Sequence, residues 1–181
     1  MKNIKCYINE SIKESDQGII EMLKFYAKNT SGYQQELYKQ KVNDADSVDV
    51  VSLSEVFTPE EIKEIKKRVN PQAKCCYENA WKLCDRFEYE GKHKIEYCEG
   101  YLNYKGLPIE HAFNKVDGKY VDITVELALK REIEDTYVTL GVYDTDKVRE
   151  VLIENGFYGD IYNSIFLNKY KENIKKWKMI F

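Results

Sequence analysis

The spacing of hydrophobic positions changes along the chain and separates helical segments from strands. Six segments place apolar residues three or four positions apart, as one face of an α-helix requires. Four others alternate apolar and polar residues or form short apolar runs between turn residues, as strands do. The predicted helices cover residues 15–28, 31–42, 59–69, 76–87, 144–155 and 160–177. The predicted strands cover residues 94–104, 111–116, 119–124 and 137–143.

Capping and turn residues mark several element ends. Thr58-Pro59-Glu60-Glu61 begins a helix, with a capping threonine, a proline in the first turn and a glutamate three residues after the cap. Asn70-Pro71 ends it, because proline disfavours a helical conformation in the preceding residue. Gly156 closes a later helix. The polar, Asp-rich segment 43–54 is predicted as a loop that ends in a short apolar run.

The order of these elements predicts an α+β fold. Helices come first, one helix then packs on an antiparallel sheet, and a further strand and helices follow. A length of 181 residues suits a single domain with one core. We divide it into a mostly helical N-terminal extension (1–57), a candidate catalytic core (58–126) and a C-terminal part with a strand and helices (127–181).

One predicted hairpin carries a histidine and an aspartate on the same face. Strands 111–116 and 119–124 flank Asp117-Gly118, a pair favoured in two-residue turns. Alternation along such strands makes His111 and Asp122 diagonal neighbours, with Cα atoms about 7–8 Å apart and within reach of a hydrogen bond. The alternative is an ordinary hairpin with both side chains in solvent. We favour the paired arrangement.

Cys76 begins the helix predicted over 76–87. The residues that continue its stripe are Ala80, Leu83, Cys84 and Phe87. We expect the thiol to point toward the surface on which the helix packs and, if that is the hairpin, toward His111. The unpaired N–H groups of the first helical turn stabilise a thiolate and can bind an oxyanion. Gln72, four residues upstream, is a candidate second donor to that oxyanion.

The other cysteines have simpler explanations. Free cysteine behaves as a small hydrophobic residue, so core packing explains Cys84 and is also the alternative for Cys76. Cys75 lies about 100° around the helix from Cys76, off the stripe, and is a second candidate nucleophile. Cys6 and Cys98 have no partner pattern and are assigned structural roles.

Four fragments in this order resemble the transglutaminase-like branch of the papain-like cysteine enzymes. They are Cys76 with Ala80 four residues later, Glu99-Gly100-Tyr101, His111-Ala112-Phe113-Asn114, and Asp122-Ile123-Thr124. The family's usual pattern is Cys-x-x-x-Ala, Gly-Tyr, His-Ala-Trp and Asp-Pro-Thr. Here Phe113 replaces the common tryptophan and Ile123 the common proline, and the three chemical groups are retained. The match covers roughly a third of the chain.

This resemblance implies a helix packed on an antiparallel sheet, with Cys76 as nucleophile, His111 as base and then acid, and Asp122 as the residue that orients the imidazole. Members and relatives of the family act as peptidases, amidases, deamidases, crosslinking acyl transferases and glycan-amide hydrolases, and some have lost catalysis. We therefore expect a cysteine hydrolase or acyl transferase acting on an amide-type bond of a protein, peptide or small molecule. Tyr77 and Tyr101 are candidates for lining its substrate groove, with core placement as the alternative.

Composition narrows the protein class. A mean hydropathy of −0.60 with 33% charged residues fits a soluble protein. No run is apolar enough to span a membrane, the start lacks a signal-peptide core, and five cysteines without framework spacing indicate a reducing compartment. We therefore expect a cytoplasmic protein. With two histidines and no CxxC, we expect no metal site and no cofactor. The Arg-poor, Lys/Tyr/Asn/Ile-rich composition is typical of AT-rich bacterial or phage genomes.

The near-balanced net charge of −3 points to no polyanionic partner, and we expect no nucleic-acid binding. One local exception is 168–178, with five lysines and two aromatic residues. It is either an anionic-surface patch or the solvated face of an amphipathic terminal helix, and we favour the helix. Its expected inward residues are Ile165, Phe166, Tyr170, Ile174 and Trp177. The sequence predicts no particular oligomeric state.

Two functional hypotheses follow from the sequence. The first is an enzyme in which the Cys76 thiolate attacks a carbonyl with the help of His111 and Asp122. The second is a non-catalytic module that keeps a papain-like groove to recognise a ligand or partner protein. Retention of all three chemical groups favours the enzyme.

Overall fold

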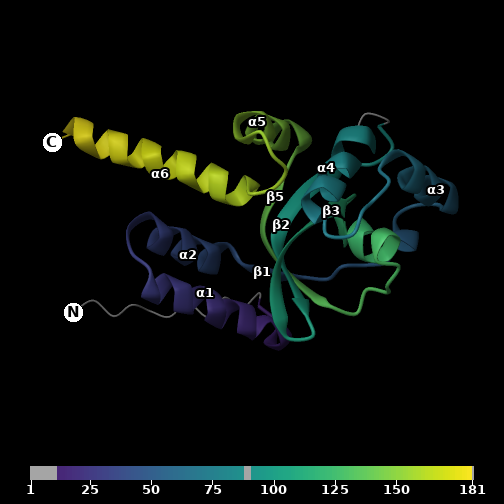
Figure 1. The fold of residues 1–181 in the computed structure, drawn as a ribbon, viewed down its shortest axis with the longest axis horizontal. Coiled ribbons are helices and arrows are strands. Elements are labelled where there is room, and N and C mark those ends of the chain that lie inside the picture. The colour runs from purple at the N-terminus through teal and green to yellow at the C-terminus, as the bar shows by residue number, and fades with distance from the viewer. Residues whose placement is uncertain (1–11, 88–90, 181) are drawn as a thin grey trace.

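A curled, five-stranded antiparallel sheet lies at the centre of the protein (Figure 1). The computed structural model describes residues 12–87 and 91–180. The strands are β1 (Asp46–Val48), β2 (Ile95–Tyr104), β3 (Leu107–Val116), β4 (Lys119–Val121) and β5 (Thr136–Tyr143). Their order across the sheet is β1-β5-β2-β3-β4, and each neighbouring pair is antiparallel. The predicted α+β class is confirmed.

The six predicted helices are present, with small shifts at their ends. They are α1 (Gln17–Asn29), α2 (Gly32–Asp44), α3 (Pro59–Arg68), α4 (Cys76–Phe87), α5 (Thr145–Asn155) and α6 (Ile161–Ile180). The capping box of α3 forms: the Thr58 hydroxyl accepts the backbone N–H of Glu61, and the Glu61 carboxylate accepts that of Thr58. Gly156 ends α5 in the left-handed conformation, with φ of 75°.

The strands differ from the prediction at their ends. A two-residue turn, Lys105-Gly106, joins β2 directly to β3, so β3 begins at Leu107 rather than near His111. Strand β4 ends at Val121, three residues before its predicted end at Thr124, and a single π-helical turn spans Thr124–Ala128. The segment 43–54, predicted as a loop, contributes β1, which pairs with β5.

The two faces of β3 have different partners. Ala112 and Val116 pack with the buried side of α4, and the Asn114 amide donates to the carbonyl of Ala80 on α4 at 3.0 Å. His111 and Phe113 lie on the opposite face by alternation. The helix thus covers the face of β3 opposite His111, although the Cys76 thiol still lies beside the imidazole, as expected for a helix packed on the hairpin. The apolar stripe of α4 is confirmed, because its four predicted members are all buried.

Helices α1, α2 and α6 pack against the part of the sheet formed by β2 and β5 (Figure 1). Buried apolar residues from these elements form one cluster, which includes Leu23, Leu37 and Val138. The buried Glu99 carboxylate on β2 accepts the backbone N–H groups of Ile161 and Tyr162, at 3.1 and 2.9 Å, and so holds the first turn of α6.

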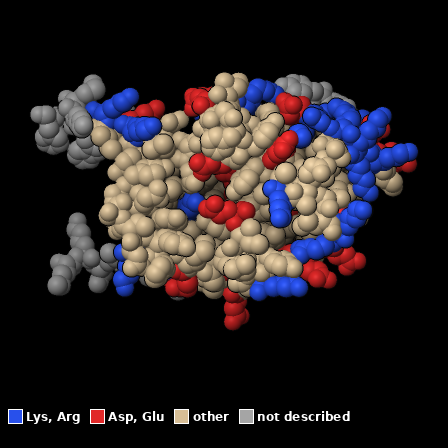
Figure 2. Space-filling view, viewed as in Figure 1, with Lys and Arg blue, Asp and Glu red and all other residues tan. Residues whose placement is uncertain are grey.

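The C-terminal helix follows the expected pattern only in its first half. Phe166 and Tyr170 contact the ring of Tyr33 on α2, as an amphipathic helix predicts. Ile174 is exposed, so its expected inward position is wrong, and the side chain of Trp177 lies outside those described. Figure 2 shows lysine and arginine side chains gathered over α3, whose last turn carries three basic residues. Within residues 12–87 and 91–180, no helix combines the length and apolar character needed to cross a bilayer.

Candidate active site

The half-buried Cys76 lies beside two buried residues, His111 and Asp122. Nε2 of His111 lies 2.6 Å from Oδ2 of Asp122. The Cys76 thiol, on the first residue of α4, lies beside the same imidazole and contributes to the rise of its pKa. The imidazole of His111 thus interacts with both of the other groups. The predicted proximity of His111 and Asp122 is confirmed.

The hairpin register brings this pair together. Val116 lies opposite Lys119, and Lys115 opposite Tyr120, as the Asp117-Gly118 turn predicts. Asn114 lies opposite Val121 in the same register. His111 and Asp122, further from the turn on either side, are therefore diagonal neighbours across the hairpin. A shift of one residue in this register would put them on opposite faces.

Burial and charge together determine the protonation of His111. The ring is only 6% exposed. Burial alone lowers the pKa of His111, but the Asp122 carboxylate and the contact with Cys76 outweigh it and raise the pKa to about 10. The imidazole beside Cys76 is therefore charged at neutral pH.

Asp122 is fully buried and receives hydrogen bonds on both oxygens. Oδ1 accepts the backbone N–H groups of Thr124 and Val125, at 2.8 and 3.1 Å. Oδ2 accepts the hydroxyl of Tyr137 at 3.0 Å in addition to contacting His111. Burial raises the pKa of Asp122, but His111 and these donors lower it below its ordinary value. The carboxylate is therefore held as an anion that orients the imidazole.

The start of α4 supplies unpaired N–H groups beside the thiol. The carbonyl of Cys75 accepts the N–H of Asn79 at 2.8 Å, so Cys76 lies in the first turn, where N–H groups have no partner within the helix. The Asn79 side chain hydrogen-bonds the backbone N–H and carbonyl of Gln72. The side-chain amide of Gln72 donates to the carbonyl of Asn70 at 3.0 Å. In this structure the Gln72 side chain is thus engaged away from Cys76.

The two tyrosines predicted to line a substrate groove differ in exposure. Tyr77 is half-buried, and a Cβ added at Gly159 would lie 2.8 Å from its ring. Tyr101 is buried in the cluster formed with α1 and α2, and its hydroxyl donates to Glu110 at 3.3 Å. Tyr101 therefore occupies the core position that was the alternative, whereas Tyr77 adjoins Cys76 at a partly open surface.

Cys75, Cys84 and Cys98 form no disulfide and differ in exposure. Cys84 and Cys98 are buried, and burial raises the pKa of Cys98 well above its ordinary value. Cys75 is half-buried, like Cys76. The structural assignment of Cys84 agrees with its contact with the Asn114 amide at 3.3 Å. Cys6 lies outside the described residues.

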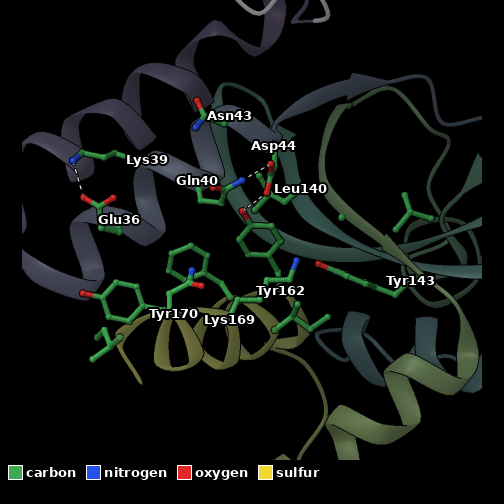
Figure 3. A pocket seen from close by; sticks show the side chains of 16 residues that line it. Glu36, Lys39, Gln40, Asn43, Asp44, Leu140, Tyr143, Tyr162, Lys169 and Tyr170 are labelled. Carbon is green, nitrogen blue, oxygen red and sulfur yellow. Dashed lines mark hydrogen bonds and ion pairs between the residues drawn. The ribbon is translucent and has the colours of Figure 1, made fainter. Parts of the chain in front are cut away.

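A groove of about 740 Å³ lies between α2, β5 and α6 (Figure 3). Its lining includes the rings of Tyr143, Tyr162 and Tyr170, and none of the three clustered residues. A much smaller hollow, about 20 Å³, adjoins Tyr77 and is lined by Glu99, Glu110, Asp160 and Lys41, among others. As it stands, it holds no more than about one water molecule.

Three residues of this site were not identified from the sequence. Asn79 and Tyr137 carry no motif, and Thr124 was noted only as part of the Asp-Ile-Thr fragment. A polar residue on the buried side of α4, one turn after Cys76, was the available signal for Asn79. Tyr137 comes from β5, which joins the site only through the fold of the sheet.

Comparison with family models, curated proteins and solved structures finds no match to this chain. The resemblance to transglutaminase-like enzymes therefore stays a prediction. What bears on function is the geometry of the cluster itself: a thiol at a helix start, an imidazole beside it, and a buried carboxylate bound to Nε2 of that imidazole.

Proposed function

We propose that the protein is a cysteine-nucleophile hydrolase or acyl transferase that acts on an amide-type bond through Cys76, His111 and Asp122. The substrate class is an amide of a protein, peptide or small molecule, so that peptidase, amidase, deamidase and transglutaminase-like reactions all fall within the proposal. On this account the fold is a variant of the papain-like core, with α4 carrying the nucleophile.

The observation that carries the proposal is the buried contact between His111 and Asp122, 2.6 Å long, with the thiol on the same ring. A charged pair taken out of water is costly, and apolar residues of similar size are often at least as stabilising. Such pairs with perturbed pKa values concentrate at functional sites. The arrangement provides the nucleophile, base and orienting anion that thiol catalysis requires.

The first half of the reaction forms a thioester. The thiolate of Cys76 attacks the carbonyl carbon of the amide, and the carbonyl π electrons move onto oxygen. N–H groups of the first turn of α4 are suited to stabilise this oxyanion. The imidazolium of His111 gives its proton to the amide nitrogen, the C–N bond breaks, and the amine leaves. Asp122 keeps the ring oriented throughout.

The second half releases the acyl group. Neutral His111 takes a proton from water or from a second amine as that nucleophile attacks the thioester carbonyl. Collapse of the intermediate expels the Cys76 thiolate and restores the starting protonation. Water gives a carboxylic acid, and an amine gives a new amide. Hydrolysis and transfer differ only in this nucleophile.

The decisive experiment measures the labelling rate of each cysteine by iodoacetamide at pH 7, using peptide mass spectrometry. Cys76 should react fastest, and Cys76→Ala should abolish the rapid phase. Cys75→Ala is the matched control, because Cys75 is adjacent and equally half-buried but lies off the imidazole, and it should leave the rapid phase intact. Equal labelling rates at Cys75 and Cys76 would reject the proposal and favour a non-catalytic binding module.

A further inference from the structure

We infer that Asn79 is a positioning residue that fixes the nucleophile helix against both the carboxylate turn and the Gln72 segment; the inference rests on the proposed function. Asn79 lies three residues after Cys76 on α4 and is 1% exposed. Its side chain is therefore out of reach of a substrate, and any effect it has on chemistry is exerted through the groups that it holds.

The Asn79 amide makes three hydrogen bonds, which reach two segments. Its oxygen accepts the backbone N–H of Gln72 at 3.0 Å, and its nitrogen donates to the Gln72 carbonyl at 2.7 Å. The nitrogen also donates to the hydroxyl of Thr124 at 3.0 Å. The Gln72 backbone fixes the orientation of this amide, since a backbone N–H only donates and a carbonyl only accepts. Aspartate or leucine of similar size cannot make these three bonds.

These bonds close a ring that begins and ends on α4. Cys76 contacts His111, and His111 contacts Asp122. Asp122 accepts the backbone N–H of Thr124, whose hydroxyl accepts from Asn79 on the helix that carries Cys76. Each group in the ring is thus located by the two beside it. Loss of one bond frees the helix start to move relative to the imidazole, and small displacements of reacting groups reduce rates steeply.

Asn114 provides a control for simple loss of packing. It is also a buried asparagine that attaches α4 to another element, because its amide donates to the Ala80 carbonyl and the Cys84 sulfur. Its hydrogen bonds join α4 to β3 and involve none of the residues in the ring of contacts from Cys76 to Asn79. A variant at this position should therefore reduce stability without a selective effect on the thiol.

The experiment measures iodoacetamide alkylation of Cys76 against pH, with melting temperature recorded in parallel. Asn79→Ala and Thr124→Val should move the midpoint of the alkylation profile to higher pH and lower the rate at pH 7 by about tenfold. Thr124→Ser keeps the hydroxyl and should behave as the wild type. Asn114→Ala should lower the melting temperature and leave the midpoint unchanged. Comparison of Thr124→Val with Thr124→Ser tests the role of the Asn79–Thr124 bond even if Asn79→Ala does not fold.

Two outcomes would overturn the inference. One is an unchanged profile in Thr124→Val and in any folded Asn79→Ala; the other is an equal shift in Asn114→Ala. In either case Asn79 would be an ordinary structural residue. Failure of the proposed function has a separate signature, because the wild-type protein would then show no preferential labelling of Cys76 whatever the variants do.

Discussion

Tyr137 and His111 bind the same carboxylate oxygen. The hydroxyl of Tyr137 lies 3.0 Å from Oδ2 of Asp122, and Nε2 of His111 lies 2.6 Å from that oxygen. Tyr137 is fully buried on β5, two strands away from β3 in the sheet. A third element of the fold thus determines where the orienting anion lies and how strongly it attracts the imidazole proton.

Replacement of Tyr137 by phenylalanine tests this contact. Tyr137→Phe removes one donor from a buried carboxylate and should lower the free energy of unfolding by about 2 kcal/mol. Because the carboxylate then has fewer donors, it attracts the imidazolium more strongly and the pKa of His111 should rise. Urea unfolding measures the first effect and the pH dependence of Cys76 alkylation the second. Tyr120→Phe is the matched control, because the ring of Tyr120 also packs on Phe113 and its hydroxyl is not a donor to Asp122. A similar loss of unfolding free energy in Tyr120→Phe would contradict the account.

The raised pKa of His111 predicts how stability depends on pH. The pKa is about 10 in the folded protein and about 6.5 in an unfolded chain, so the folded state binds the proton more tightly. The resulting stabilisation is fully present below about pH 6.5 and is lost as pH rises through 10. Urea unfolding from pH 6 to pH 10 should therefore show a decline that is smaller in His111→Gln. Parallel curves for the two proteins would show that the imidazole is not charged in the fold.

Gly100 is predicted to tolerate no side chain. It lies directly opposite His111, beside an irregularity in the pairing of β2 with β5, and a Cβ there would lie 1.9 Å from the carbonyl oxygen of Val138. Because backbone cannot move aside cheaply, Gly100→Ala should destabilise the protein by on the order of 3 kcal/mol. Gly18→Ala in α1 is the control: open space surrounds that position, and alanine favours helix by about 0.5–1 kcal/mol. Equal thermal stability of the two variants would contradict the close approach of β5.

The features that could be predicted from the sequence are those that short segments determine by themselves. The Asp117-Gly118 turn fixes the register of its hairpin, and from that register came the pairing of His111 with Asp122. The helix beginning at Cys76 followed from the Asn70-Pro71 break and the apolar stripe. These predictions needed no knowledge of distant contacts.

The features that could not be predicted depend on contacts between distant segments. Strand β1 has three residues and exists as a strand through its pairing with β5. The π-helical turn after β4 depends on Asp122 accepting the N–H groups of Thr124 and Val125, which the strand pattern of that segment does not indicate.

The local sequence pattern also did not predict which face of β3 contacts α4. The residues Ala112 to Val116 are all well buried apart from Lys115, so both faces of this strand are covered and alternation alone does not say which one meets the helix. In the fold, the face that meets the helix is the one carrying Asn114, whose amide donates to the carbonyl of Ala80. The thiol still contacts His111 because it lies on the first residue of the helix.

The central claim is that sulfur, imidazole and carboxylate form one charged, hydrogen-bonded unit. Nitrogen-15 NMR of the histidine rings reports it directly, and His93→Gln assigns the His111 signal because the chain has two histidines. His111 should remain an imidazolium through pH 8, and Cys76→Ala should lower its pKa, since the thiol contributes to the upward shift. A neutral ring at pH 7.5 in the wild-type protein, with a titration unaffected by Cys76→Ala, would contradict the account.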